Sequence, residues 1–254
     1  MNGMASLEKI VTFLDEELKT AQIPDYPGAM NGLQLENGGE VTKVVAAVDA
    51  SLAVFRKAIA AKADLLVVHH GMFWQGAKAI RGPVYEKLKL AMDAGLAVYS
   101  SHIPLDVHPV LGNNVKLMQA LGLGDGVPFF PWKGIELGRK ANFPGTLVEL
   151  VNRMEAAIGG GVHLRGDREA AAGIVGVITG GAGSEVEAMA AEGIETFITG
   201  EGPHWSYPLA EELGLNVLYG GHYATETFGV RELGRILRAE FSLEYEFIDC
   251  PTGL

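Results

Sequence analysis

The chain has 254 residues, which is long enough for one large domain or two packed halves with a sizeable core. Lys and Arg number 20 against 31 Asp and Glu, a formal net charge of −11, and no basic cluster offsets it, so we expect no nucleic-acid partner. The single cysteine, Cys250, excludes a disulfide framework and a thiolate metal cage. We see no signal peptide or bilayer-spanning apolar run, and therefore expect a cytoplasmic protein with no membrane partner.

In the first half, the spacing of apolar residues predicts alternating helices and strands. Ser6 is expected to cap a helix, and Ser51 a second helix that joins strands at 44–48 and 65–68. A strand–helix–strand unit of this kind predicts a parallel sheet. The first half is expected to continue with a helix at 84–92, a strand at 96–100 and a helix at 114–121.

Residues 122–140 are rich in Gly and Pro and show no period, so we predict that they join two lobes, 1–125 and 126–254. The second lobe should begin with an amphipathic helix at 146–158. The alternating residues 243–247 predict a half-exposed edge strand, in a C-terminal segment that could pack back on the first lobe. Between them we expect strands at 174–178, 194–199 and 215–219, and helices from 184, at 208–213 and up to about residue 239.

The two halves follow the same order of elements. Residues 44–70 and 174–201 each give strand, turn, helix and strand, and each half continues through a helix and a short strand to a histidine. A carboxylate follows four residues later, as His102 and Asp106 in one half and as His222 and Glu226 in the other. The sequence therefore predicts an α/β fold of two similar lobes, an internal repeat in which helices flank the sheets.

His69 and His70 stand where the strand 65–68 reaches Gly71. Neighbouring residues on a strand point to opposite faces, so the pair could be one core and one surface histidine. Alternatively, both could face a site wide enough to need two imidazoles, such as a pair of metal ions about 3.5–4 Å apart. Ligand sites in α/β sheets lie beyond the carboxyl ends of strands, where this pair and both His-x₃-carboxylate motifs fall.

Imidazoles and carboxylates without a thiolate favour zinc, manganese, iron or nickel over calcium. Taken singly, each His-x₃-carboxylate motif is also common on ordinary helices, and His102 could simply hold Asp106. His204, at the strand end that corresponds to His69, is a candidate for the mouth of a cleft. His108 and His163 lie in polar, exposed-looking stretches and are not expected to bind metal.

Several motifs together resemble the NIF-three-like proteins, the dinuclear-metal-centre family catalogued as GTP cyclohydrolase I type 2 homologues. The motifs are Asp64-Leu-Leu-Val-Val-His69-His70-Gly, Ser101-His-Ile-Pro-Leu-Asp106, Thr199-Gly-Glu, Gly220-Gly-His222-Tyr-Ala-Thr-Glu226, Asn31-Gly-Leu-Gln34 and Gly112-Asn-Asn114. The resemblance implies a homohexameric ring. It also implies two metal ions per chain, held by five residues with His102 close by: His69, His70, Asp106, His222 and Glu226. Many relatives carry an Asp before Asn31, where this chain has Ala29-Met30.

Two classes of function follow. The first is a metal-dependent hydrolase that acts on a nucleotide-like or phosphorylated small molecule, with cyclohydrolase-like chemistry by resemblance. In it, the metals supply hydroxide, and His102 and His204 are the candidate catalytic residues that move protons. The alternative is a non-enzymatic protein that binds, delivers or responds to metal. A hydrolase needs an open coordination position and a lined pocket, whereas a carrier needs neither.

Overall fold

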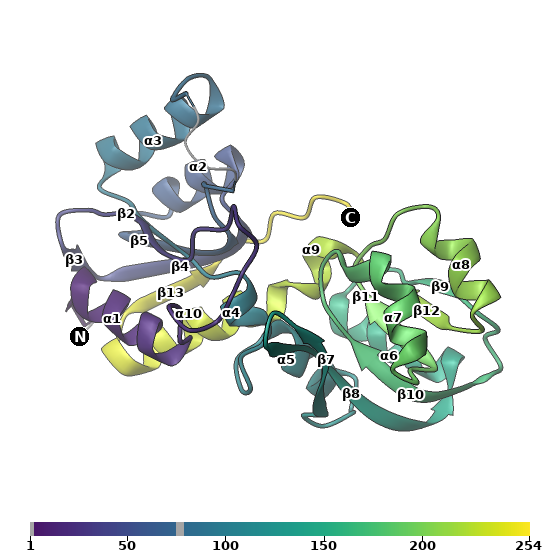
Figure 1. The fold of residues 1–254 in the computed structure, drawn as a ribbon. Helices are drawn as coiled ribbons and strands as arrows, with labels where there is room; N and C mark the ends of the chain where they lie inside the picture. Colours follow the sequence, from purple (N-terminus) through teal and green to yellow (C-terminus); the bar gives the residue numbers. More distant parts are fainter. Residues whose placement is uncertain (1–2, 75–78) are drawn as a thin grey trace. The chain divides into compact units, whose positions relative to one another are not determined.

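The computed structural model describes residues 3–74 and 79–254 and shows a mixed α/β protein of two compact units (Figure 1). Unit 1 consists of Met1–Leu105 with Gly229–Cys250, and unit 2 of Asp106–Phe228 with Pro251–Leu254. The chain therefore leaves unit 1 after Leu105, returns to it at Gly229 and ends in unit 2 from Pro251. In the part of the chain that the structure describes, no helix is long and apolar enough to cross a membrane.

Unit 1 is built on a five-stranded sheet of order β13-β4-β5-β6-β2. The four strands β13, β4, β5 and β6 are parallel, and β2 is antiparallel to β6. The elements of this unit are β1 (Ala5–Ser6), α1 (Leu7–Glu17), β2 (Gly32–Leu35), β3 (Glu40–Val41), β4 (Lys43–Asp49), α2 (Leu52–Ala60), β5 (Leu65–His70), α3 (Pro83–Ala94), β6 (Ala97–Ser100), α10 (Thr227–Phe241, whose first two residues belong to unit 2) and β13 (Glu244–Phe247). Strands β1 and β3 form a separate antiparallel pair.

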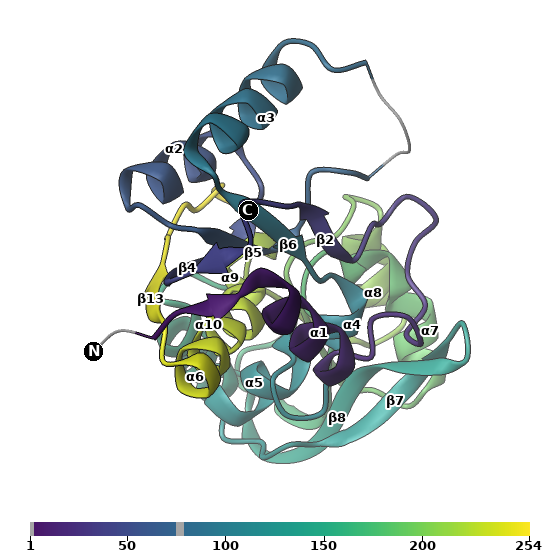
Figure 2. The same cartoon turned by 90° about the vertical axis from the view of Figure 1, so that its left-hand side faces the viewer.

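Helices cover both faces of this sheet, with α2 and α3 on one side and α1 and α10 on the other (Figure 2). Val45 and Ala47 of β4, and Leu66 and Val68 of β5, pack in the core beneath α2 and α3. Because side chains alternate along a strand, their neighbours face α1 and α10, and they too are fully buried. A strand buried on both faces needs a continuous apolar sequence, and this explains the run from Leu65 to Val68.

Local sequence signals set the helix starts in unit 1 as predicted. The Ser6 hydroxyl accepts a hydrogen bond from Lys9 N at the start of α1, and the Ser51 hydroxyl accepts one from Val54 N at the start of α2. The predicted edge strand is β13, which lies at the edge of the sheet with alternating exposure.

Unit 2 is built on a six-stranded sheet of order β7-β8-β10-β11-β12-β9. Strands β10, β11 and β12 are parallel, and the other neighbouring pairs are antiparallel. Its elements are α5 (Asn113–Ala120), β7 (Val127–Trp132), β8 (Ile135–Thr146), α6 (Leu147–Ile158), β9 (His163–Arg165), β10 (Ala171–Val177), η1 (Ala182–Glu185), α7 (Val186–Ala191), β11 (Thr196–Thr199), α8 (Ser206–Glu212), β12 (Asn216–Tyr219) and α9 (His222–Thr225). The short helix α4 (Ile103–Asp106) spans the boundary between the units.

Helices α5 and α6 pack on one face of this sheet, where Ile198 of β11 and Leu218 of β12 enter the same apolar cluster. The alternate residues Phe197 and Val217 are fully buried on the other face, where α8 lies against β12 through the 3.1 Å contact between Ser206 Oγ and Tyr219 Oη. Thr146 caps α6 in a capping box with Glu149, so this helix begins where the sequence predicts.

The sheet orders confirm two similar α/β units. In unit 1 the parallel strands β4, β5 and β6 are followed by antiparallel β2, and in unit 2 the parallel strands β10, β11 and β12 are followed by antiparallel β9. Each unit thus contains three parallel strands followed by one antiparallel strand, and the loops after corresponding strands also correspond.

Two features of the middle of the chain differ from the sequence-based expectation. The boundary between the units falls at Leu105/Asp106 and not at 125/126, because Leu117, Met118 and Leu121, on and just after α5, pack in the core of unit 2. The prediction that residues 122–140 only join two lobes was wrong, because 127–146 forms the antiparallel pair β7–β8 of the unit 2 sheet.

Candidate metal centre

Three histidines of unit 1 converge where β5 and β6 end. His69 and His70 are the last two residues of β5, and their ring centroids lie 4.7 Å apart. The ring of His102, two residues after β6, lies 5.0 Å from that of His69 and 5.7 Å from that of His70. Each of the three offers a ring nitrogen within 4.8 Å of the other two, so they could ligate a common ion. The strand therefore carries both histidines into one site.

An oxygen acceptor holds Nδ1 of each of these rings. His69 Nδ1 lies 2.8 Å from the carbonyl oxygen of Ser101, and His70 Nδ1 lies 2.8 Å from Asp49 Oδ1. His102 Nδ1 lies 2.9 Å from Asp25 Oδ1. An imidazole that donates from Nδ1 presents Nε2 to a metal, and such oxygen partners are characteristic of metal-binding histidines.

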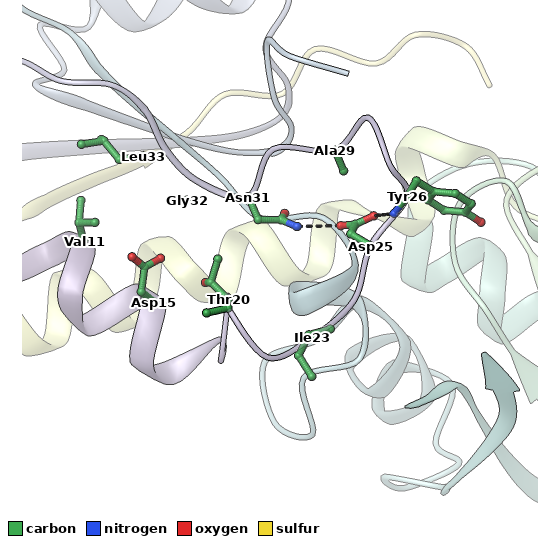
Figure 3. Close-up of a pocket in the computed structure, with 11 residues that line it drawn as sticks. Val11, Asp15, Thr20, Ile23, Asp25, Tyr26, Ala29, Asn31, Gly32 and Leu33 are labelled. Carbon is green, nitrogen blue, oxygen red and sulfur yellow. Dashed lines mark hydrogen bonds between the residues drawn. The ribbon is translucent and has the colours of Figure 1, made fainter. Parts of the chain in front are cut away.

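Asp25 reaches His102 from the loop before β2 and lines a cavity of about 580 Å³ in unit 1 (Figure 3). Its Oδ2 accepts hydrogen bonds from Asn31 Nδ2 at 2.8 Å and from Ile103 N at 3.1 Å. Burial raises the pKa of Asp25, but its contacts with His102, Asn31 and Tyr26 outweigh burial and hold the pKa below its usual value. This chain has Ala29-Met30 where many relatives carry an Asp before Asn31. Asp25, six residues before Asn31, nevertheless supplies an acidic side chain beside His102.

The Asn31-Gly-Leu-Gln34 motif holds the loops that carry the histidines. Asn31 Oδ1 accepts a hydrogen bond from His102 N at 2.7 Å, and Gln34 Oε1 accepts one from Met72 N at 2.7 Å. Trp74 closes the cluster, with its ring edge-on to His102 at 4.8 Å and to His70 at 5.6 Å. The motif thus fixes the backbone on both sides of the site.

In unit 2, His222 begins α9 just beyond the end of β12 and lies between two carboxylates. Its Nδ1 lies 2.7 Å from Glu201 Oε1, and its Nε2 lies 3.2 Å from Glu226 Oε2. Burial lowers the pKa of His222, but the hydrogen bonds and charges of Glu226 and Glu201 outweigh it and raise the pKa to about 9. Glu201 therefore holds Nδ1 of His222 in the same way that Asp49 holds Nδ1 of His70.

Gly180, three residues after β10, leaves room for Glu226. A Cβ at this position would lie 2.1 Å from Glu226 Oε1, and Gly180 has a φ of +73°. Gly180 N also donates a hydrogen bond to Thr225 Oγ1, next to Glu226. Close approach and left-handed backbone thus both require glycine here.

Asp106 is buried in unit 2, and one of its carboxylate oxygens lies within 4.8 Å of a Glu226 oxygen. Asp106 Oδ1 accepts hydrogen bonds from Asn113 Nδ2 at 2.8 Å and from Thr179 Oγ1 at 3.4 Å. Asn114 Oδ1 accepts from Thr179 N at 2.9 Å, so the Gly112-Asn-Asn114 motif positions Asp106 and the loop after β10.

The other predicted histidines lie elsewhere. His204 is exposed and its ring stacks on Tyr207 at 6.5 Å, and among the described residues it belongs to none of the groups that could hold a metal ion. His163 is exposed and lies 5.4 Å from the Tyr207 ring. His108, expected to be exposed, is buried, because its Nδ1 accepts hydrogen bonds from Val110 N and Leu111 N and so closes a turn.

The donors of each unit are of kinds that bind divalent metal ions. Unit 1 carries three candidate imidazoles, and unit 2 carries one imidazole and two carboxylates. Nitrogen and oxygen donors of this kind suit zinc, iron, manganese or nickel. Sequence reasoning assigned no role to Asp25, Asp49 or Glu201, although Glu201 ends the Thr199-Gly-Glu motif. Their carboxylates hold histidines of the candidate site. Asp49 and Glu201 were detectable, since each ends or follows a parallel strand next to one that leads to a histidine.

The fold and the two groups of side chains define a two-unit α/β protein with candidate metal ligands at the carboxyl ends of parallel strands. A family model described as Duf34/NIF3 (NGG1p interacting factor 3) matches residues 5–252. The chain belongs to this family.

Relatives and solved structures cover nearly the whole chain. A Deinococcus radiodurans protein named GTP cyclohydrolase 1 type 2 homolog is 39% identical over 254 residues, covering 99% of this chain and 96% of the relative. A protein of the same name from Pyrococcus abyssi is 40% identical over 253 residues, covering 97% and 99%. The structure of protein ybgI, of unknown function, has a TM-score of 0.87 at 34% identity, covering 98% and 100%. TTHA1606 from Thermus thermophilus has a TM-score of 0.85 at 38% identity, with the same coverage.

Proposed function

We propose that this protein binds two divalent metal ions per chain and is a metal-dependent hydrolase acting on a nucleotide-like or phosphorylated small molecule. The proposed metal ligands come from both units and are His69, His70, Asp106, His222 and Glu226, with His102 beside them. The metal is one of zinc, iron, manganese or nickel.

The observation that carries the proposal is how the three proposed imidazole ligands are held. His69, His70 and His222 each place Nδ1 2.7–2.8 Å from an oxygen acceptor, and two of these acceptors are carboxylates. Core histidines need no such uniform partner, whereas histidines that bind metal through Nε2 do.

The path of the chain supports ligands from both units. The chain passes from unit 1 to unit 2 between Leu105 and Asp106 and returns between Phe228 and Gly229. Asp106 stands at the first crossing, and Glu226 stands three residues before the second. Candidate ligands therefore lie at or near two of the three points where the chain crosses between the units.

The surrounding residues indicate how such a site would act. Bound divalent ions would supply Lewis acidity and a water of lowered pKa. Asp25 holds His102 by Nδ1, so a proton could pass at Nε2, and we propose His102 as the residue that moves protons during hydrolysis. We also propose that His204 takes a secondary part in proton transfer at the mouth of the site. Its exposure and its ring contact with Tyr207 support this role. By family resemblance we also propose a cytoplasmic homohexamer.

Metal analysis and a turnover screen on the same protein samples test this function. After reconstitution, wild-type protein should retain up to two divalent ions per chain, whereas Asp106→Ala and Glu226→Ala should retain less. His163→Ala, in an exposed histidine, is the matched control and should match wild type. Equal loss in all three variants would show that the ligands were wrongly chosen. Full metal content without hydrolysis of any phosphorylated or nucleotide-like compound would favour the non-enzymatic alternative, a metal-binding, regulatory or delivery protein.

A further inference from the structure

Unit 2 contains a cavity of about 350 Å³ that adjoins the candidate ligand His222. Glu201, Gly220 and Gly221 line it on that side. Small-molecule pockets in proteins range from about 300 to 1,000 Å³, so this one has room for a single compact ligand. The last residues of the chain contribute to its wall, and Leu254 O accepts a hydrogen bond from Tyr223 N at 2.9 Å.

Aromatic rings dominate the side chains of this cavity. Tyr207 and Tyr219 stack with their centroids 4.6 Å apart and their planes at 16°. The His163 ring lies 5.4 Å from Tyr207 and 6.3 Å from Tyr219, and Tyr223 also lines the space. Rigid aromatic walls favour flat, aromatic ligands, because ring faces and edges attract one another and lose little conformational entropy on binding.

Glu201 supplies the acidic side chain of the cavity, and none of the described lining residues is Lys or Arg. A carboxylate accepts hydrogen bonds and disfavours anions. Glu201 Oε1 already accepts from His222 Nδ1, and the second oxygen gives this side chain further acceptor capacity. The lining therefore suits a neutral or cationic ring with N–H donors better than it suits a phosphate, which the Glu201 carboxylate would repel.

We propose that this cavity binds a planar nitrogen heterocycle, which stacks on the tyrosines and donates an N–H hydrogen bond to Glu201. We further assign this ring to the substrate of the proposed hydrolase, as the part that unit 2 recognises. This assignment rests on the proposed function. Because Glu201 also holds His222, ligand in the cavity and metal at His222 share one residue and should alter each other's affinity by the same factor.

Isothermal titration of the full chain with 2-aminobenzimidazole tests the proposal in both metal-stripped and metal-loaded protein. This probe is flat, carries N–H donors and has no phosphate. 1,2-Dimethylbenzimidazole, which lacks N–H donors, should bind more weakly, and ribose 5-phosphate should not bind to metal-stripped protein. Tyr207→Leu should weaken 2-aminobenzimidazole binding at least about fivefold, because it removes the binding free energy of one aromatic stacking contact. Tyr85→Leu, in an exposed tyrosine of unit 1, should leave it unchanged.

A second variant and separate readouts keep the outcomes distinct. His163→Leu changes an exposed lining ring, so it should also weaken binding even if Tyr207→Leu does not fold. Absence of binding at millimolar 2-aminobenzimidazole, or equal affinity in both lining variants and wild type, would overturn the ring site. The metal content of the same samples is measured separately, so the metal centre is tested whichever result is obtained. Binding that survives metal removal while no hydrolysis is found would support the ring site and count against the hydrolase.

Discussion

In metal-free protein, His222 should remain protonated well above neutral pH. Its ring lies 2.7 Å from Glu201 Oε1 and 3.2 Å from Glu226 Oε2. Burial lowers the pKa of His222, but the two carboxylates outweigh burial and raise the pKa from 6.5 to about 9. A rise of this size corresponds to roughly 3 kcal/mol in favour of the protonated folded state.

The sign of the pH dependence follows from the direction of this shift. Because the pKa of His222 is higher in the folded chain than in the unfolded chain, its stabilisation is fully present below pH 6.5 and is lost as pH rises through about 9. A metal ion requires the deprotonated ring, so metal binding improves over the same range. Stability of the metal-free protein should therefore fall between pH 6.5 and 9, while the stability gained on adding metal should grow.

An NMR titration of the His222 ring proton at Cε1 measures this pKa directly. Metal-stripped wild type should titrate near pH 9, and Glu201→Gln should titrate lower, since one of the two charges is removed. Thermal melts of metal-stripped and metal-loaded protein at the same pH values supply the stability difference. A His222 pKa near 6.5 in metal-stripped wild type, or a metal-induced stabilisation that stays flat with pH, would refute the reasoning.

Three further predictions concern the supports of the site and the assembly. Gly180→Ala should lower metal affinity because its Cβ would meet Glu226, whereas Gly193→Ala, with a φ of +72° and no atom within 4 Å of its Cβ, should cost only about 1–2 kcal/mol of stability. Metal titrations and melts of both variants separate the effects, and equal metal affinity would contradict the role of Gly180. Asp49→Ala should weaken metal binding about 10- to 100-fold through His70, as measured by competition with a chelator, and affinity at the wild-type level would remove Asp49 from the site. Light scattering should report six chains, and a stable monomer at micromolar concentration would contradict the ring.

Much of the fold could be predicted because its signals are local. A few consecutive apolar residues predict each of the buried strands β4 and β5. A single serine predicts where each of the helices α1 and α2 begins, at Ser6 and Ser51. The pair β7–β8 could not be predicted in this way. Pro128 and Pro131 lie in β7, an edge strand, where a missing N–H is tolerated but the turn-like composition hides the strand.

The candidate ligands were accessible from sequence because they follow strands in repeated motifs. The supporting carboxylate Asp25 was not, because its contact with His102 joins residues 77 positions apart. The division of the chain was also hidden, since α5 packs with α6 of unit 2 through contacts that no local pattern encodes.

The most direct test of the central claim is anomalous X-ray diffraction from crystals of metal-loaded full-length chain, recorded at the absorption edge of the bound metal. The proposed centre predicts two peaks about 3.5–4 Å apart, with imidazole nitrogens at about 2.0–2.1 Å. His69, His70 and His222 should contribute Nε2, while their Nδ1 atoms keep their oxygen partners. A site with no peak at these histidines, or peaks bound only by other residues, would contradict the dinuclear centre.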